Sequence, residues 1–146
     1  MGLQAFNCGA NLVSYSKNNK NYAMIVAWAM MVDYSKVALL MGGQADTSRN
    51  LELGDEIGIS ALSKGQEEIG KNVGSTHSSK VNKLNLFPFE KDGQAILCKG
   101  AKTKMVGKVI KINENEDHDK FVIVEINKYS QDENKEFAYG YDPKLY

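Results

Sequence analysis

The chain has 146 residues, of which 42% are hydrophobic and 25% are charged, a balance that is ordinary for a globular protein and favours a single domain over residues 1–146. Lys and Arg together number 18, as do Asp and Glu, so the formal net charge is zero. This neutrality argues against a protein built mainly to grip nucleic acid or an anionic membrane, because both tasks favour a basic surface.

A short strand is predicted at residues 11–16, and the polar cluster at residues 17–21 has the composition of a turn. Residues 23–32 then form the longest apolar run, which contains the lone Trp28. Ten residues cannot cross a bilayer as a helix, which needs about 20. The run is therefore interpreted as one strand, either buried on both faces or forming the wall of a ligand slot.

Residues 33–75 alternate between short strands and short helices. Asp46 or Thr47 can cap the first helix, and the pair Ser63 and Gln66 matches a capping box that opens the second. The expected elements are a turn at residues 33–36, strands at 37–41 and 56–62, a helix at 46–54, and a helix that starts after Ser63, carries Ile69 and Val73 on one side and ends at Gly74.

The second half of the chain is dominated by strands. A polar loop at residues 75–83 precedes them, and an acidic loop at residues 113–119 joins the last two. Six or seven strands with two short helices indicate an antiparallel β-barrel with peripheral helices. The last three strands are expected at residues 95–99, 105–112 and 120–129, the third with Val122, Val124 and Ile126 pointing one way.

Cys8 and Cys98 are far apart in the sequence, which favours two reduced thiols over a disulfide framework or a zinc site. The N-terminus lacks a basic start followed by an apolar core, so we expect no secretory signal. Both observations predict a cytoplasmic protein. The two histidines are also distant from each other, and no metal site is predicted.

Short motifs occur in a characteristic order. Residues 22–28 read YAMIVAW, residues 42–47 read GGQADT after a strand, and residues 57–62 read IGISAL. Residues 116–118 read EDH, and residues 124–126 read VEI. In order and spacing this set resembles the flavin reductase-like family, the FMN-binding split β-barrels. Ile25 and Ala27 stand where the family often has Thr and Ser, which removes two possible hydrogen bonds to the flavin.

The resemblance implies a mainly β protein, an antiparallel split β-barrel with a few short peripheral helices. It implies a homodimer whose flavin sites lie at the subunit interface. The expected cofactor is FMN, with FAD or riboflavin as alternatives, and the expected co-substrate is NAD(P)H. Hydride would pass from the nicotinamide to the flavin, and electrons would pass on to a small-molecule acceptor.

A flavin needs a flat apolar slot, polar donors and an anion site. The strand residues Ala27, Trp28, Ala29 and Met30 could supply the slot and backbone donors. The alternative is that Trp28 is simply a core aromatic. For the phosphate, we expect free backbone N–H groups, hydroxyl donors and a guanidinium from Gly42, Gly43, Gln44, Thr47, Ser48 and Arg49. The alternative for Thr47 is a helix cap that binds no ligand.

Two further residues are candidates for the site. His118 occupies the family's Gly-Asp-His position and could orient the substrate or move a proton; the alternative is an exposed loop histidine. Lys80 could reach a phosphate from a neighbouring loop, or that loop could simply be solvated.

Two other functions stay open on the sequence. One is a flavin- or haem-binding barrel that carries electrons without turnover of its own. The other is a β-barrel interaction protein that binds no cofactor. A nucleic-acid-binding barrel is less favoured, because the sequence has no basic face interleaved with aromatic residues.

Overall fold

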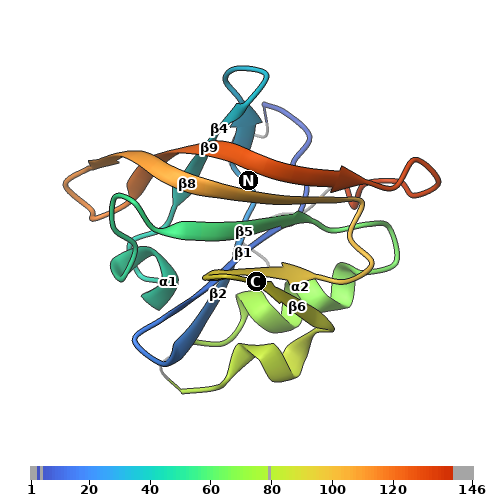
Figure 1. Cartoon of the computed structure of the whole chain (residues 1–146), viewed down its shortest axis with the longest axis horizontal. Helices are drawn as coiled ribbons and strands as arrows, with labels where there is room; N and C mark the ends of the chain where they lie inside the picture. The colour runs from blue at the N-terminus through green and yellow to red at the C-terminus, as the bar shows by residue number, and fades with distance from the viewer. Residues whose placement is uncertain (1–2, 4, 79, 140–146) are drawn as a thin grey trace.

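Antiparallel strands, with three short helices, make up the architecture of the chain, which was analysed as a computed structural model describing residues 3, 5–78 and 80–139 (Figure 1). The strands are β1 (Asn11–Lys17), β2 (Lys20–Val26), β3 (Ala29–Met31), β4 (Lys36–Met41), β5 (Glu56–Ala61), β6 (Phe89–Asp92), β7 (Ala95–Cys98), β8 (Thr103–Glu114) and β9 (Lys120–Gln131). The helices are α1 (Asp46–Arg49), α2 (Glu67–Gly74) and the 3-10 helix η1 (Lys83–Leu86). The expected antiparallel split β-barrel with short peripheral helices is confirmed.

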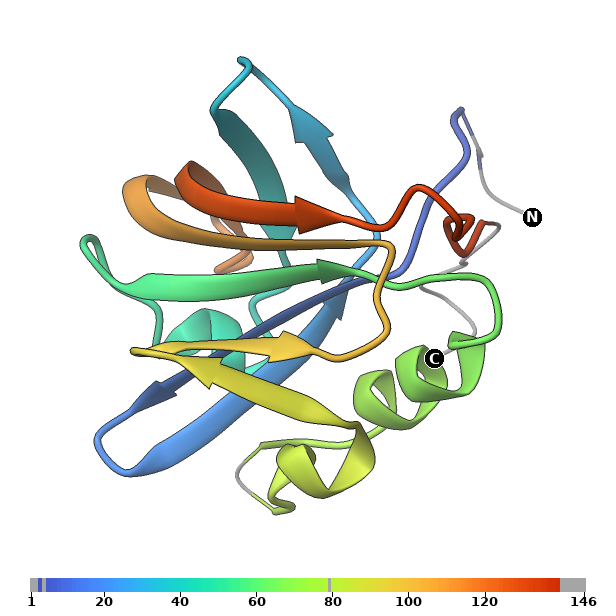
Figure 2. The ribbon, with the colours of Figure 1, turned by 45° about the vertical axis from the view of Figure 1, so that its right-hand side comes forward.

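The nine strands of the described residues form one antiparallel sheet in the order β3-β4-β9-β8-β5-β1-β7-β6, with β2 on the other edge of β1. The sheet divides at β1. The first half of β1 pairs with β5, whereas Tyr15 pairs with Ala95 of β7 and the Ser16 N–H donates to the Gln94 carbonyl at 2.8 Å. Strands β5 and β7 diverge from this point, with α2 and η1 below (Figure 2).

Strand β2 separates two hydrophobic cores, because its side chains alternate between them. Tyr22 and Met24 point into the barrel core, where Tyr22 stacks on Tyr15 with ring centroids 5.2 Å apart. Ala23 points the other way, into a second core that α2 and η1 cover with Val73 and Leu84. The predicted inward side of α2 is thus confirmed at Val73.

The prediction of one strand across residues 23–32 is wrong. Its first part lies in β2 and is buried on both faces, but the chain leaves β2 at Ala27 and Trp28. It then exchanges its pairing partner: β2 pairs with β1, whereas β3 pairs with β4. Strand β3 lies at the end of the sheet order, so Trp28 is 59% exposed and Met30 64%. The alternative that Trp28 is a core aromatic is therefore wrong as well.

Other local expectations are corrected by the structure. Helix α1 is shorter than expected and has Ala45 at its N-cap position, so neither Asp46 nor Thr47 caps it. The Gln66 side chain accepts a hydrogen bond from the Ser63 N–H at 3.1 Å, but α2 begins at Glu67 with Gln66 itself at the N-cap position, so Ser63 does not cap the helix and the predicted capping box is not formed. Strand β6 and helix η1 were not predicted. Together, β6 and the division of the apolar run into β2 and β3 raise the expected six or seven strands to nine in the described residues.

Lys83 is a buried cation that joins η1 to two neighbouring elements. Its ammonium donates to the carbonyl oxygens of Ala23 in β2, at 2.7 Å, and of Val73 in α2, at 3.0 Å. Burial lowers the pKa of Lys83 to about 8, and nearby Asp46 opposes this shift. Since the charged form is disfavoured by burial, the lysine couples stability to pH.

We expect the free energy of unfolding to rise between pH 8 and pH 10 through this group. In that window the unfolded chain, with an ordinary lysine pKa of 10.5, holds a proton that the folded protein has released. The gain relative to Lys83→Met should be about 2 kcal/mol. Urea unfolding at several pH values measures it, and Lys99→Met, at an exposed lysine, serves as the control. Parallel profiles for wild type and Lys83→Met would contradict the assignment.

Candidate functional site

A pocket of about 450 Å³ opens where β4, α1 and the β8–β9 hairpin meet. Its volume lies within the range of about 300–1,000 Å³ that is usual for small-molecule sites. We name it the Arg49 pocket. It is bounded by the glycine bend, residues 42–44, and by the β8–β9 turn, residues 115–119. Its lining residues are Gly43, Gln44, Arg49, Glu114, Asp117, His118 and Lys120.

Side chains from β1 and β9 hold α1 in place beside this pocket. A helix of four residues is too short to be stable alone, so it depends on tertiary contacts. Three donors bind backbone carbonyls of α1 and the residue after it: the Tyr15 hydroxyl binds Thr47 O at 2.6 Å, the Lys17 ammonium binds Asn50 O at 2.8 Å, and the Lys120 ammonium binds Ser48 O at 2.7 Å.

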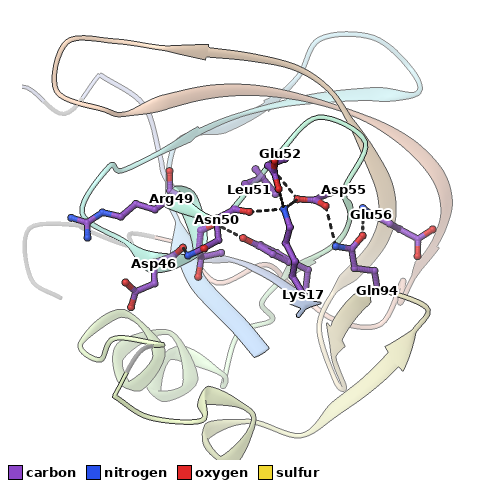
Figure 3. Close-up of polar contacts among 12 residues, drawn as sticks. Lys17, Asp46, Arg49, Asn50, Leu51, Glu52, Asp55, Glu56 and Gln94 are labelled. Atoms are coloured by element: carbon purple, nitrogen blue, oxygen red, sulfur yellow. Dashed lines mark hydrogen bonds and ion pairs between the residues drawn. The ribbon is translucent and has the colours of Figure 1, made fainter. Parts of the chain in front are cut away.

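Lys17 is also the centre of a polar cluster that fixes the loop between α1 and β5 (Figure 3). It forms ion pairs with Glu52 and, at 2.9 Å, with Asp55. Burial acts to raise the pKa of Asp55, but hydrogen bonds, that from Lys17 foremost, outweigh it and leave the pKa below its usual value. Figure 3 shows the Arg49 side chain extending away from this cluster. The cluster therefore anchors the loop, whereas the Arg49 side chain lines the pocket.

The glycine bend is clamped between α1 and the β8–β9 turn. The Gly43 N–H donates to Asp119 Oδ1 at 2.8 Å, and Arg49 Nε donates to the Gly43 carbonyl at 2.9 Å. A Cβ atom on Gly43 would lie 2.5 Å from the backbone oxygen of His118, so the two segments touch through backbone. The expectation that the N–H groups of this bend are free is corrected at Gly43, whose N–H already has an acceptor.

Gly43→Ala should therefore destabilise the protein by about 1–3 kcal/mol, because the added methyl group must push two backbone segments apart. Gly42→Ala is the matched control: a Cβ atom at Gly42 meets no described atom within 4 Å. Its effect should stay within about 0.5 kcal/mol. Denaturant unfolding compares the two variants, and equal stabilities would show that the close approach has no energetic weight.

The pocket carries charges of both signs. Arg49 and Lys120 supply two cations, and Glu114 and Asp117 supply two carboxylates from the β8–β9 hairpin. His118 lies 3.5 Å from Glu114, measured from Nδ1 to Oε2, and its side chain is 76% exposed. Its φ of 65° is a left-handed conformation suited to a tight turn. The geometry thus combines the two readings of His118: it is an exposed turn residue and it also lines the pocket.

Four of the residues predicted from the sequence meet in the Arg49 pocket: Gly43, Gln44, Arg49 and His118. Thr47 and Ser48 do not, since they are 1% and 0% exposed. The Ser48 hydroxyl donates to the Met41 carbonyl at 3.4 Å, and the Thr47 hydroxyl is buried with no partner among the described residues. Their expected role as phosphate donors is therefore not supported, because protein covers both hydroxyls.

The remaining predicted residues lie elsewhere. Gly42 belongs to the glycine bend but does not line the pocket. Lys80 lies in the exposed loop after α2, where its N–H donates to the His77 carbonyl at 3.0 Å. Ala27, Trp28, Ala29 and Met30 lie on the opposite side of β4 from β9, at the sheet edge.

Strand register gathers apolar residues on one face beside the pocket. Phe121 of β9 pairs with Leu40 of β4, whose N–H donates to the Trp28 carbonyl at 2.9 Å. Two residues further along β4, Ala38 pairs with both Ile123 and Met30. Phe121 is 43% exposed, so the face is open to solvent near Trp28 as well. We name these two rows the apolar face: Trp28, Leu40 and Phe121, then Met30, Ala38 and Ile123.

Sequence reasoning missed Lys120, Asp119 and Glu114. Each lies in or next to a stretch that reads as a solvated acidic loop. The pairing of Met41 with Lys120 brings this loop to the glycine bend. Among the described residues, no group of three or more His, Cys, Asp or Glu could hold a metal ion, and no helix has the length and apolar character to cross a membrane.

A family model described as the flavin reductase like domain matches residues 3–146. A search of curated proteins found no match. Among solved structures, the NADH:FAD oxidoreductase SgcE6 of Streptomyces globisporus C-1027 is similar with a TM-score of 0.83 and 18% identity, over 92% of this chain and 81% of that one.

Two further structures have the same fold. A flavoredoxin from Methanosarcina acetivorans aligns with a TM-score of 0.80 and 16% identity, over 90% of this chain and 72% of that one. An FMN-binding protein from Thermus thermophilus, with bound p-hydroxybenzaldehyde, aligns with a TM-score of 0.78 and 15% identity, over 90% of this chain and 75% of that one. At these identities the likeness shows the shared fold.

Proposed function

The chain belongs to the flavin reductase-like family, and on this premise we propose that it is an FMN-binding oxidoreductase that passes hydride or electrons from NAD(P)H to a small-molecule acceptor. The observation that carries the proposal is the Arg49 pocket, where the cations Arg49 and Lys120 line a glycine bend next to an apolar sheet face and the carboxylates Glu114 and Asp117 lie on the hairpin side. This donor set fits a phosphorylated flavin, which combines a dianion with an apolar ring system.

The phosphate would be held by Arg49, with Lys120 adding charge and Gln44 adding a side-chain amide. A guanidinium presents a planar fork of donors that matches phosphate oxygens. Within the described part of the chain Arg49 donates only through Nε, to the Gly43 carbonyl, so its terminal nitrogens would be the ones that contact the phosphate. The Lys120 ammonium already donates to the backbone carbonyls of Ser48 and Leu51, so its part in holding the phosphate would be electrostatic.

The apolar face would bind the flavin ring, and a second copy of the chain would cover the ring from the other side. Exposed apolar residues that are contiguous on a sheet mark an interaction site. The face has no charged side chain in either row, and the next pair along the strands is Lys36 with Glu125. A two-fold contact would bring the face of one copy against that of the other. Trp28 and Met30, which are exposed in one subunit, would then line the ring site.

A bound flavin supplies the hydride- and electron-transfer chemistry, and the protein supplies binding, orientation and the exclusion of water. His118 would act at the mouth of the pocket, where its imidazole can donate or accept a hydrogen bond and so orient the nicotinamide substrate or move a proton. Its position on a tight turn keeps the ring exposed to an incoming molecule. Lys80 does not line the pocket and would not contact the flavin in this arrangement.

The visible absorption spectrum of the purified protein tests flavin binding directly. We expect a bound yellow cofactor or, after addition, tighter binding of FMN than of riboflavin. Anaerobic addition of NADH and NADPH should bleach the flavin, and the faster donor identifies the co-substrate. Bound flavin that neither donor bleaches would indicate an electron carrier. Absence of binding to FMN, FAD, riboflavin and haem would indicate an interaction protein and overturn the proposal.

The location of the protein in the cytoplasm stays a prediction, based on its two unpaired cysteines. Cys8 and Cys98 are both free in the structure. Burial raises the pKa of the Cys98 thiol to about 11, so it stays protonated near neutral pH. Neither thiol is needed in the proposed reaction.

A further inference from the structure

We propose that Asp119 is a positioning residue of the Arg49 pocket: its carboxylate fixes the glycine bend and thereby sets the affinity of the pocket for the flavin phosphate. The inference rests on the proposed function, since it concerns the same phosphate. Asp119 does not line the pocket itself. Its effect would pass through Gly43 to Arg49.

The first step is the contact between Asp119 and the bend. Asp119 Oδ1 accepts the Gly43 N–H at 2.8 Å, and the residue after Asp119 begins β9. The carboxylate therefore ties the bend to the start of a long strand. The Gly43 carbonyl, on the other side of the same residue, accepts a hydrogen bond from Arg49 Nε at 2.9 Å. One glycine thus connects the carboxylate to the guanidinium.

The second step is the rigidity of the turn that carries Asp119. Asn115 Oδ1 accepts the N–H groups of both Asp117 and Asp119 at 2.9 Å. The His118 N–H donates to the Asn115 carbonyl at 3.0 Å, and the Asn115 N–H to the Asp119 carbonyl at 3.0 Å. These bonds close the turn on itself, so the carboxylate has a fixed base from which to hold the bend.

The position and the charge of the Asp119 carboxylate predict opposite effects on FMN binding. A carboxylate close to a phosphate site repels the phosphate, so charge alone predicts that removing Asp119 strengthens FMN binding. The positioning role predicts weaker FMN binding, because the Gly43 N–H loses its acceptor and the bend that bonds to Arg49 is no longer fixed. The sign of the change in affinity therefore decides between the two effects.

The experiment compares three variants by titration with FMN and with riboflavin. Asp119→Ala should weaken FMN binding about tenfold and riboflavin binding by less than about threefold. Asp119→Asn keeps an oxygen that can accept the Gly43 N–H, so it should restore FMN binding to within about threefold of wild type. Glu116→Ala is the charge control: it removes an exposed carboxylate from the same turn, outside the lining of the pocket, and leaves the Gly43 bond intact, so it should not weaken FMN binding.

Hydrogen exchange tests the positioning role of Asp119 without any ligand. Hydrogen exchange of the Gly43 amide should accelerate about tenfold or more in Asp119→Ala and stay near wild type in Asp119→Asn and Glu116→Ala. Thermal unfolding by circular dichroism identifies a variant that has lost its fold, and Asp119→Asn then carries the comparison with wild type.

The outcomes are distinguishable. Equal or tighter FMN binding in Asp119→Ala, with wild-type Gly43 exchange, would overturn the positioning role and leave the proposed function standing. Weakened FMN binding in both Asp119 variants would also overturn it, since rescue by Asn is required. If wild type itself binds neither FMN nor riboflavin, the proposed function fails, and the Gly43 exchange rates alone decide whether Asp119 holds the bend.

Discussion

Replacing Arg49 by alanine is expected to weaken FMN binding about 10- to 100-fold, while riboflavin binding changes by less than about twofold. The reason is chemical: the guanidinium is the one cation of the Arg49 pocket that presents a fork of donors, and only FMN carries a phosphate for it to bind. Isothermal titration of both ligands measures the two affinities.

Two control variants define the interpretation. Arg49→Lys keeps the charge but loses the Nε bond to the Gly43 carbonyl, so it should fall between wild type and alanine. Lys80→Ala removes a cation from an exposed loop outside the pocket and should leave both affinities near wild type. Equal losses for FMN and riboflavin in Arg49→Ala would show that Arg49 acts on the ring or on folding rather than on the phosphate.

Replacing Phe121 by aspartate should convert the proposed dimer into monomers and lower flavin occupancy. Phe121 lies in the row of the apolar face that contains Trp28 and Leu40, and a carboxylate there would be buried without a partner in a two-fold contact. Loss of an aromatic hot-spot residue costs an interface about 2 kcal/mol or more, so the dimer dissociation constant should rise at least about 30-fold. Light scattering after gel filtration gives the mass, and absorbance gives the bound flavin.

Tyr129→Asp is the matched control. Tyr129 lies on the same strand and is 67% exposed, but β4 pairs only with residues 120–125 of β9. It should stay dimeric and keep its flavin. Because Phe121 is 43% exposed in one subunit, its replacement should not unfold the barrel. A wild-type protein that is monomeric at micromolar concentration would contradict the proposed dimer outright.

Local sequence patterns predicted most of the strands of the barrel but did not predict which strands pair with one another. Val122 and Val124 alternate with less buried neighbours, and both are fully buried as their spacing predicts. Residues 23–32, by contrast, are apolar throughout, so their composition carries no mark of the point at which the chain leaves one partner strand for another. Strand β6, with sequence FEKD, is short and mostly charged, and it is a strand only because β7 pairs with it.

The site shows the same division between local and long-range information. The glycine pair and the nearby arginine were visible as a candidate anion site, and Gly43 and Arg49 do line one pocket. The partner of Gly43 was not visible, because Asp119 lies 76 positions away and looks like part of a solvated acidic turn. Burial of Thr47 and Ser48 was equally hidden, since it follows from how α1 docks against β1 and β9.

Strand β3 closes the sheet order with only three residues and, among the described residues, has no strand on its outer side. Unsatisfied backbone donors and acceptors along such a rim can template other extended chains, and the apolar side chains of Ala29, Met30 and Met31 offer no charge to discourage this. The shortness of β3 limits this hazard, because a rim of three residues offers few backbone groups to an incoming strand. A lysine introduced there would act as a gatekeeper against precipitation.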